Sequence, residues 1–196
     1  MALTKHKSAS VSQLRRGVKR DQRVVRTGKQ IDAAFVELLH RRAYGDIRVS
    51  DITRKAHVGR ATFYAHYASK DELLRSQFGR IVAPMLAIRN GRCPLEATAF
   101  FLHVQTSPRI YKALVASPTA GNAPRIIREC FEDRVAEALA TACFADTQQP
   151  MIKRFVASSL FAVTECWVER GAVESPHEIQ ELFSRLVGEG LGGAGR

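Results

Sequence analysis

The stretch SDITRKAHVGRATFYAHYASKDELL, residues 50–74, decides the fold of this chain. It reads as two short helices joined by a tight turn, followed by the start of a third helix. Thr62 and His66 lie four positions apart on the second helix, about 100° around from its apolar edge, where hydrogen-bonding groups face outward. A helix-turn-helix presents its second helix to DNA in this way. Each short helix has one apolar pair to bury at a spacing of four: Ile52 with Ala56, and Phe63 with Tyr67.

The net charge of the chain is confined to its first part. Residues 1–80 hold 18 Lys and Arg against 7 Asp and Glu, whereas residues 81–196 hold 12 of each. A charge placed at one end creates a field that attracts a polyanion to that end. Nucleic acid fits this field best. A membrane surface is the main rival, but the basic N-terminal residues lack the regular Trp, Phe and Leu face of an interfacial helix.

Length and composition set further limits. With 196 residues, 45% of them hydrophobic, the chain can bury one good core plus a small appended domain. No apolar run approaches the roughly 18 residues that span a bilayer, and residues 1–20 lack the hydrophobic stretch of a secretory signal. We therefore expect a cytoplasmic protein with no membrane partner. We also expect no metal and no cofactor, because the cysteines show no zinc-binding spacing and are best interpreted as buried apolar residues: Cys93, Cys130, Cys143 and Cys166.

The chain divides into three predicted parts. Residues 1–26 carry eight Lys and Arg against a single Asp and show little apolar periodicity, so we expect a disordered arm that either follows DNA phosphates or is merely solvated. Residues 27–75 form the helix-turn-helix domain. Residues 76–196 form a second helical domain, whose glycine-rich end, 188–196, we expect to fray. With no convincing strand, the predicted fold class is all-α.

Capping signals and apolar periodicity place the helices. Pro84 should bend or end the fourth helix, because it lacks the N–H that would bond to the preceding turn. In the second half, prolines favour the first position of a helix and so mark helix starts. The predicted helices are 27–44, capped by Thr27 and closed by Gly45; 49–57; 60–67; a fourth opened by Ser69 and Glu72; 95–105; starts at Ser107-Pro108 and Ser117-Pro118; Pro124 to about Ala145; Pro150 to Gly171; and Ser175 to about Val187.

The stretch from about Thr27 to Phe78 resembles the DNA-binding domain of the tetracycline-repressor (TetR/AcrR) family of bacterial regulators. More faintly, residues 155–187 resemble the closing helix pair of that family, which in the family forms a four-helix bundle between two subunits. The alternative is that these helices simply pack inside their own subunit. The first resemblance is carried by the order, identity and spacing of Asp51-Ile52, Ala56-His57-Val58, Thr62-Phe63-Tyr64, His66-Tyr67 and Lys70-Asp71-Glu72-Leu73-Leu74.

Three positions depart from the family pattern. His57 stands where the family usually has the turn glycine, so either histidine accepts a positive φ or the turn differs. Gly59 replaces the Ser that frequently caps the helix predicted over 60–67. The loss is small, because glycine also caps helices. Arg48 occupies the usual Thr or Ser cap position of the helix predicted over 49–57, which indicates a phosphate contact in place of a backbone cap.

The resemblance implies a set of DNA contacts. Tyr64, His66 and Lys70 would contact phosphates and sugars, unless Tyr64 and His66 merely cover the small core. We expect Arg60 to read a base, since a guanidinium can address guanine O6 and N7 together. Thr62 would contact the backbone or a base edge, and Ala61 a thymine methyl. The complete predicted DNA-binding set is Arg48, Ser50, Arg60, Ala61, Thr62, Tyr64, His66 and Lys70.

These features predict a homodimeric, ligand-responsive transcriptional regulator, a repressor that binds palindromic double-stranded DNA and dimerises through its last two helices. The resemblance further implies a pocket for an unknown small-molecule effector in the second half. Aromatic residues at helical spacing are more often core than pocket, and we expect core for most of the candidates. The candidate wall residues are Phe100, Phe101, His103, Val104, Phe131, Phe155 and Trp167.

Two other classes of function compete with this prediction. A sequence-independent DNA-coating protein would also explain the basic arm, but it would show no palindromic preference. An enzyme is less expected, because the sequence has no glycine-rich phosphate loop after a strand, no HExxH motif and no Gly-x-Ser-x-Gly elbow. Enzymatic activity would need an unrecognised site in the second half.

Overall fold

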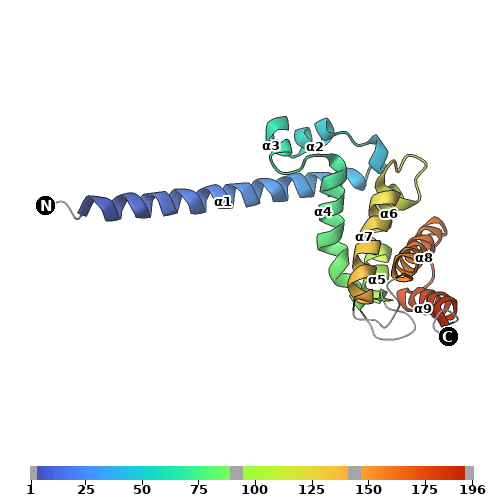
Figure 1. The fold of residues 1–196 in the computed structure, drawn as a ribbon. Helices are drawn as coiled ribbons and strands as arrows, with labels where there is room; N and C mark the ends of the chain where they lie inside the picture. The colour runs from blue at the N-terminus through green and yellow to red at the C-terminus, as the bar shows by residue number, and fades with distance from the viewer. Residues whose placement is uncertain (1–3, 89–94, 141–146, 193–196) are drawn as a thin grey trace.

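The computed structural model describes residues 4–88, 95–140 and 147–192. Within these ranges the regular secondary structure is helical apart from one short antiparallel ladder, which pairs Ala87 with Glu96 and Ile88 with Leu95. Figure 1 shows a long first helix projecting away from a group of short helices, with longer helices packed on the other side of α4. The elements are α1 (Thr4–Leu39), the 3-10 turn η1 (Tyr44–Asp46), α2 (Val49–Lys55), α3 (Arg60–Tyr64), α4 (Lys70–Val82), η2 (Ala83–Met85), β1 (Ala87–Ile88), β2 (Leu95–Glu96), α5 (Thr98–Thr106), α6 (Pro108–Val115), α7 (Ala123–Leu139), α8 (Gln149–Glu169) and α9 (Pro176–Gly192).

The head of the molecule consists of the C-terminal end of α1 with η1, α2, α3 and the start of α4. Helices as short as α2 and α3 are not stable alone in water, so their packing must hold them. Burial of each large apolar side chain contributes roughly 1.5–3 kcal/mol. The fully buried residues of this small core come from all four helices: Ile31, Phe35, Ile52, Phe63 and Leu73.

Helix α4 joins the head to the bundle formed by α5–α9. Leu73 and Leu74 near its start are buried in the head. One turn further on, the ring of Phe78 lies 5.5 Å from that of Phe131 on α7, in an edge-on arrangement. Buried residues of head and bundle therefore belong to one continuous core. The predicted division between residues 75 and 76 falls inside α4, and the domain boundaries stay a prediction.

The first helix differs most from the prediction. Helix α1 begins at Thr4 rather than at Thr27, so residues 4–26 of the segment expected to be disordered are helical. The absence of an apolar stripe indicates only that a segment has nothing to pack against. Lys, Arg, Gln and Ala are good helix formers, and residues 4–39 contain no proline to stop the helix. Helix α1 also ends at Leu39, so Gly45 does not close it and lies in η1 instead.

Several helix boundaries are confirmed and others are wrong. Helix α4 ends at Val82, just before Pro84, and the backbone N–H of Glu72 donates to Ser69 Oγ at 3.0 Å. At the start of α9, Ser175 Oγ likewise accepts the N–H of Glu178 at 3.3 Å, and the Ser175 N–H donates to the Glu178 carboxylate at 2.7 Å. The differences are that α2 and α3 end at Lys55 and Tyr64, residues 117–122 form turns rather than a helix, Leu95 lies in a strand, α7 ends at Leu139, and α9 continues past Val187 to Gly192. Residues 193–196 of the segment expected to fray lie outside the described residues, and the fraying stays a prediction. The predicted end of α7 near Ala145, within 141–146, lies outside the described residues.

The cysteines are only partly as predicted. Cys130 is half-buried, and burial raises the pKa of its thiol to about 11. Cys166 is exposed on α8, so the prediction of a buried residue is wrong there. Cys93 and Cys143 lie outside the described residues. No group of three potential metal ligands occurs in the part of the chain that the structure describes, and no helix in that part is both long and apolar enough to cross a membrane.

Candidate DNA-binding surface

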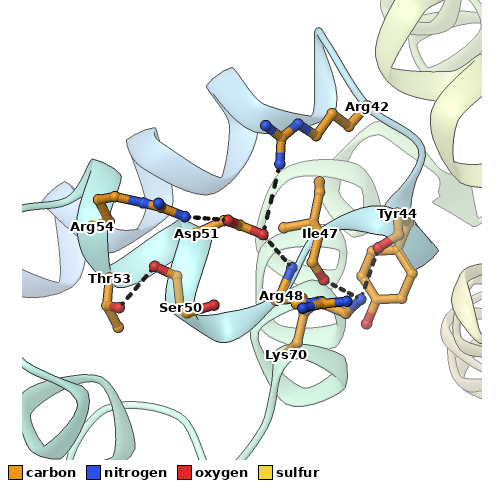
Figure 2. Close-up of polar contacts among 9 residues, drawn as sticks. All are labelled: Arg42, Tyr44, Ile47, Arg48, Ser50, Asp51, Thr53, Arg54 and Lys70. Carbon is orange, nitrogen blue, oxygen red and sulfur yellow. Dashed lines mark hydrogen bonds and ion pairs between the residues drawn. The ribbon is translucent and has the colours of Figure 1, made fainter.

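Asp51 fixes the start of α2 (Figure 2). Its Oδ2 accepts the backbone N–H of Arg48 at 2.9 Å, and its Oδ1 accepts from the Arg54 guanidinium at 2.6 Å. Arg42 approaches Oδ2 at 3.7 Å. The backbone hydrogen bond from Arg48, together with these two cations, holds the pKa of Asp51 below its usual value. Asp51 therefore caps the helix, and the exposed side chain of Arg48 is not needed for capping.

Helix α3 presents one face to solvent. Gly59 adopts the extended conformation of an N-cap, with φ −73° and ψ 155°. Phe63 is fully buried, and its ring meets that of Tyr64 edge-on at 5.5 Å between centroids. The remaining predicted contact residues of α3 are exposed, as is Ser50 at the start of α2: Arg60, Ala61, Thr62 and Tyr64.

The turn between α2 and α3 contains a strained residue. His57 has φ +53°, so histidine accepts the positive-φ conformation where glycine was expected. The next residue, Val58, donates its N–H to the carbonyl of Thr53 at 3.0 Å and closes the turn. A left-handed conformation costs a non-glycine residue about 1–2 kcal/mol.

Replacing His57 by glycine should therefore raise the free energy of unfolding by up to about 1 kcal/mol, since relief of strain exceeds the added freedom of the unfolded chain. Urea unfolding followed by circular dichroism measures this change. His40, just after α1, has no positive φ, so His40→Gly should lower stability instead. A loss of stability in His57→Gly equal to that in His40→Gly would contradict the strain argument.

Lys70 has a partner inside the head (Figure 2). Its Nζ donates to the carbonyl oxygens of Tyr44 and Ile47, both at 2.7 Å, and lies 4.1 Å from the centre of the Tyr44 ring. Burial lowers the pKa of Lys70 below its usual value. Lys70 thus fastens the chain between η1 and α2 to the start of α4, a role different from the predicted phosphate contact.

His66 is half-buried beside α1. A Cβ added to Gly28 would meet its Nδ1 at 3.5 Å, so the imidazole packs directly over this glycine. Its ring also lies 6.3 Å from that of Tyr67, at a tilt. One side of His66 is therefore covered, as in the alternative that His66 helps to cover the small core.

A second polar group that orients the head was missed from the sequence. The hydroxyl of Tyr67 donates to Asp32 Oδ1 at 2.7 Å, and the guanidinium of Arg80 donates to Asp32 Oδ2 at 2.6 Å. Asp32 is buried on α1, so these bonds tie α1 to the segment after α3 and to α4. The partners are 35 and 48 residues from Asp32, and no local spacing could have connected them.

The turn between α6 and α7 is hydrogen-bonded to η1. The N–H of Gly45 donates to the carbonyl of Thr119 at 2.8 Å, and the Thr119 hydroxyl donates to Asp46 Oδ2 at 2.9 Å. Nearby, the Asn122 amide donates to Asp71 Oδ2 at 2.9 Å, and the Tyr44 hydroxyl donates to Asp71 Oδ1. These contacts attach the bundle to the head next to Lys70, at the end of the segment that leads into α2.

The candidate effector-pocket residues lie in different surroundings among the described residues. Phe100, Phe101, Val104 and Phe131 are fully buried, with the Phe100 ring 5.4 Å from that of Phe131 in an edge-on contact. Trp167 is buried beneath a groove between α8 and α9, Phe155 is 43% exposed on α8, and His103 lines a cavity between the head and the bundle.

Comparison with known proteins agrees with this architecture. Residues 31–76 match the family described as "Bacterial regulatory proteins, tetR family", and residues 98–189 match the family "Transcriptional regulator C-terminal region". The two matches cover most of the chain after residue 30.

Two curated relatives and one solved structure illustrate the similarity. YxbF, an uncharacterised HTH-type transcriptional regulator of Bacillus subtilis, is 46% identical over 67 residues, which is 34% of this chain but 18% of that protein's length. An uncharacterised HTH-type transcriptional regulator of Mycobacterium tuberculosis is 25% identical over 187 residues, covering 90% of this chain and 86% of the relative. The crystal structure of a TetR transcriptional regulator from Streptococcus agalactiae shares the fold with a TM-score of 0.56 at 22% identity, covering 87% of this chain and 98% of that one.

The exposed face of α3, the basic head and the family matches lead to the same conclusion. The chain is a DNA-binding transcriptional regulator, and it belongs to the TetR family.

Proposed function

We propose that the protein is a homodimeric repressor that acts in the cytoplasm, binds a palindromic operator through α3 and releases it when a small molecule binds. The observation that carries the DNA-reading part is the exposed face of α3 within the basic first 80 residues, with Arg60 at the start of the helix. In a helix-turn-helix, the first residues of the second helix are the ones that reach base edges.

Arg60 is the proposed base reader. Its side chain is exposed and α3 places it beside Ala61 and Thr62, which are exposed as well. Arg48 and Ser50, at the start of α2, would meet the phosphates that flank the groove. Phosphate contacts set affinity and its salt dependence, whereas a bidentate contact from Arg to guanine discriminates between sequences by about 1–3 kcal/mol.

The test is selection of binding sites from random duplex DNA with the wild type and Arg60→Ala. The variant should lose preference at one position of each half-site and bind the selected operator about 10- to 100-fold more weakly, which fluorescence anisotropy would measure. Arg109→Ala, at an exposed position on α6, is the matched control and should change neither. An unchanged sequence preference in Arg60→Ala would show that another residue reads the bases, and selection of no motif by the wild type would favour the DNA-coating alternative.

Exposed apolar residues on α8 and α9 support dimerisation. Met151 and Phe155 on α8 are 68% and 43% exposed, and Leu182 and Leu186 on α9 are 36% and 49% exposed. Helices α8 and α9 lie side by side, with α4 and α7 between them and α3 (Figure 1). Between them runs a groove of about 450 Å³ whose lining includes Ala162, Cys166, Leu182 and Leu186. Exposed apolar residues gathered on two neighbouring helices support a protein partner, and a second copy would supply a second α3 for the palindrome.

Small residues, which would let a partner helix approach closely, lie on two faces of α8. Ala157 is fully buried in its own subunit, whereas Ser158 and Ala162 are exposed on the same side as Phe155. The exposed pair leaves room for a second helix to approach α8 closely. Repression would then follow from two heads occupying adjacent turns of the promoter, which blocks access of the polymerase.

A ligand response requires that the ligand bind the two states with different affinities. By thermodynamic linkage, an effector that weakens operator binding must itself bind more weakly to the protein on its operator. The contacts of Gly45 with Thr119 and of Asp71 with Asn122 connect bundle and head, and they support such a coupling.

A further inference from the structure

A cavity of about 110 Å³ lies where the head meets the bundle. Helices α1 and α4 form one side of it, and α5 and α6 form the other. Four of its lining residues are partly exposed and form its mouth: Val36, Ile81, His103 and Ile110. The full lining, which we call the junction cavity, is Phe35, Val36, Leu39, Leu74, Gln77, Phe78, Ile81, Val82, His103, Ile110, Tyr111 and Leu114.

The lining of the junction cavity selects for a neutral ligand. It contains no Asp, Glu, Lys or Arg, and nearly all of it is aliphatic or aromatic. Burial lowers the pKa of His103 below its usual value, so the imidazole is mainly neutral at pH 7. A charged ligand would lose its hydration without gaining an ionic partner, which is strongly unfavourable.

Gln77 supplies an amide group to the cavity. Its side chain is 5% exposed, and its amide nitrogen is buried with no hydrogen-bond partner among the described residues. A buried polar group without a partner costs about 1–3 kcal/mol. Rotation about the last side-chain bond exchanges the amide oxygen and nitrogen, so Gln77 can offer either a donor or an acceptor to a ligand. A hydroxyl group, which both donates and accepts, suits the amide in either orientation.

The volume limits the size of the ligand. A dry cavity of about 150 Å³ lined by Leu, Ile and Phe suffices to bind benzene, whereas pockets for drug-sized ligands usually measure about 300 Å³ or more. At about 110 Å³ the junction cavity is smaller than the first of these volumes but open at its mouth, so a single six-membered ring is the largest group that it would hold.

We propose that the junction cavity binds a small neutral molecule that carries one apolar ring and one hydroxyl group, with the hydroxyl bonded to Gln77. Because α1 and α4 of the head meet α5 and α6 of the bundle at this cavity, the bound molecule would also affect how the two are held together. This assignment names a class of ligand for the proposed ligand response. Only the effect of the bound molecule on DNA binding rests on that proposed function.

Calorimetric titration of the full chain with phenol, without DNA, tests the site. Phenol should bind about tenfold more tightly than benzene, which corresponds to one hydrogen bond, and benzoate should not bind. In Gln77→Leu, phenol and benzene should bind equally, and the variant should be no less stable because an unpaired buried amide is removed. Ile81→Trp should block the mouth and abolish binding of both, whereas Leu102→Trp, at a residue that is 53% exposed on α5, should bind like the wild type.

Equal affinities of the wild type for phenol and benzene, the absence of phenol binding, or phenol binding that persists in Ile81→Trp would each overturn the proposal. The outcome is independent of the proposed ligand response. Phenol binding that leaves operator affinity unchanged would support the site and contradict the response. Release of the operator by another compound, with no phenol binding, would contradict the site alone.

Discussion

Replacement of Gly45 by alanine is expected to lower the free energy of unfolding by about 2–3 kcal/mol. A Cβ at this position would overlap the carbonyl oxygen of Thr119, the atom that accepts the Gly45 N–H at 2.8 Å. Gly121 is also close, because a Cβ added at position 45 would lie 3.4 Å from the backbone nitrogen of Gly121. Backbone atoms cannot rotate away as a side chain can, so the turn between α6 and α7 must separate from η1. Urea unfolding measures the loss.

Gly79→Ala is the matched control for this substitution. Gly79 lies inside α4, and a Cβ there would meet nothing within 4 Å. Alanine is the better helix former, so this variant should gain about 0.5–1 kcal/mol. The two substitutions make the same chemical change with opposite expected signs. If Gly45→Ala is as stable as the wild type, the contact between Gly45 and Thr119 does not hold bundle and head together.

Leu186→Glu is expected to convert the proposed dimer into a monomer and to weaken operator binding about 100-fold or more. Leu186 is 49% exposed in the groove between α8 and α9, so the monomer tolerates a charge there. In a twofold interface the substitution enters twice, and two buried unpaired carboxylates strongly oppose association. Two linked heads bind their half-sites with a high effective concentration, which a monomer loses. Sedimentation velocity and fluorescence anisotropy measure the two effects.

Leu102→Glu provides the comparison for the dimer variant. Leu102 is a similarly exposed leucine, 53% exposed on α5, and is not part of the groove. This variant should remain a dimer and bind the operator like the wild type. If Leu186→Glu sediments as a dimer as well, the subunits meet through some other surface.

Local signals in the sequence predicted much of the fold. The apolar pairs of α2 and α3, the capping boxes at Ser69 and Ser175 and the proline that follows α4 involve residues within four positions of each other. Such signals are physical properties of a single turn of helix and can be recognised without knowledge of the rest of the chain. For the same reason, the exposed face of α3 could be anticipated from the position of Phe63.

The roles of individual polar residues depended on distant parts of the chain. Lys70 meets the carbonyls of Tyr44 and Ile47, which lie 26 and 23 residues before it, and its side chain is thereby used inside the head. The need for a glycine at position 45 arises from its contact with Thr119, which lies in a turn where the sequence predicted the start of a helix. The exposure of Cys166 likewise follows from which side of α8 the bundle covers, and helical periodicity does not decide that side when apolar residues surround the helix.

The length of α4 has a consequence for how the operator could be released. Thirteen residues at about 1.5 Å each make a lever roughly 20 Å long. A turn of about 5° about its C-terminal end would carry its N-terminal end about 1.7 Å sideways. Hydrogen bonds of 2.7 Å from Lys70 to the segment before α2 could not follow such a displacement unless that segment moved as well. A small rotation of α4 in the bundle would thus displace the segment before α2, and with it the helix-turn-helix, by about an atomic radius.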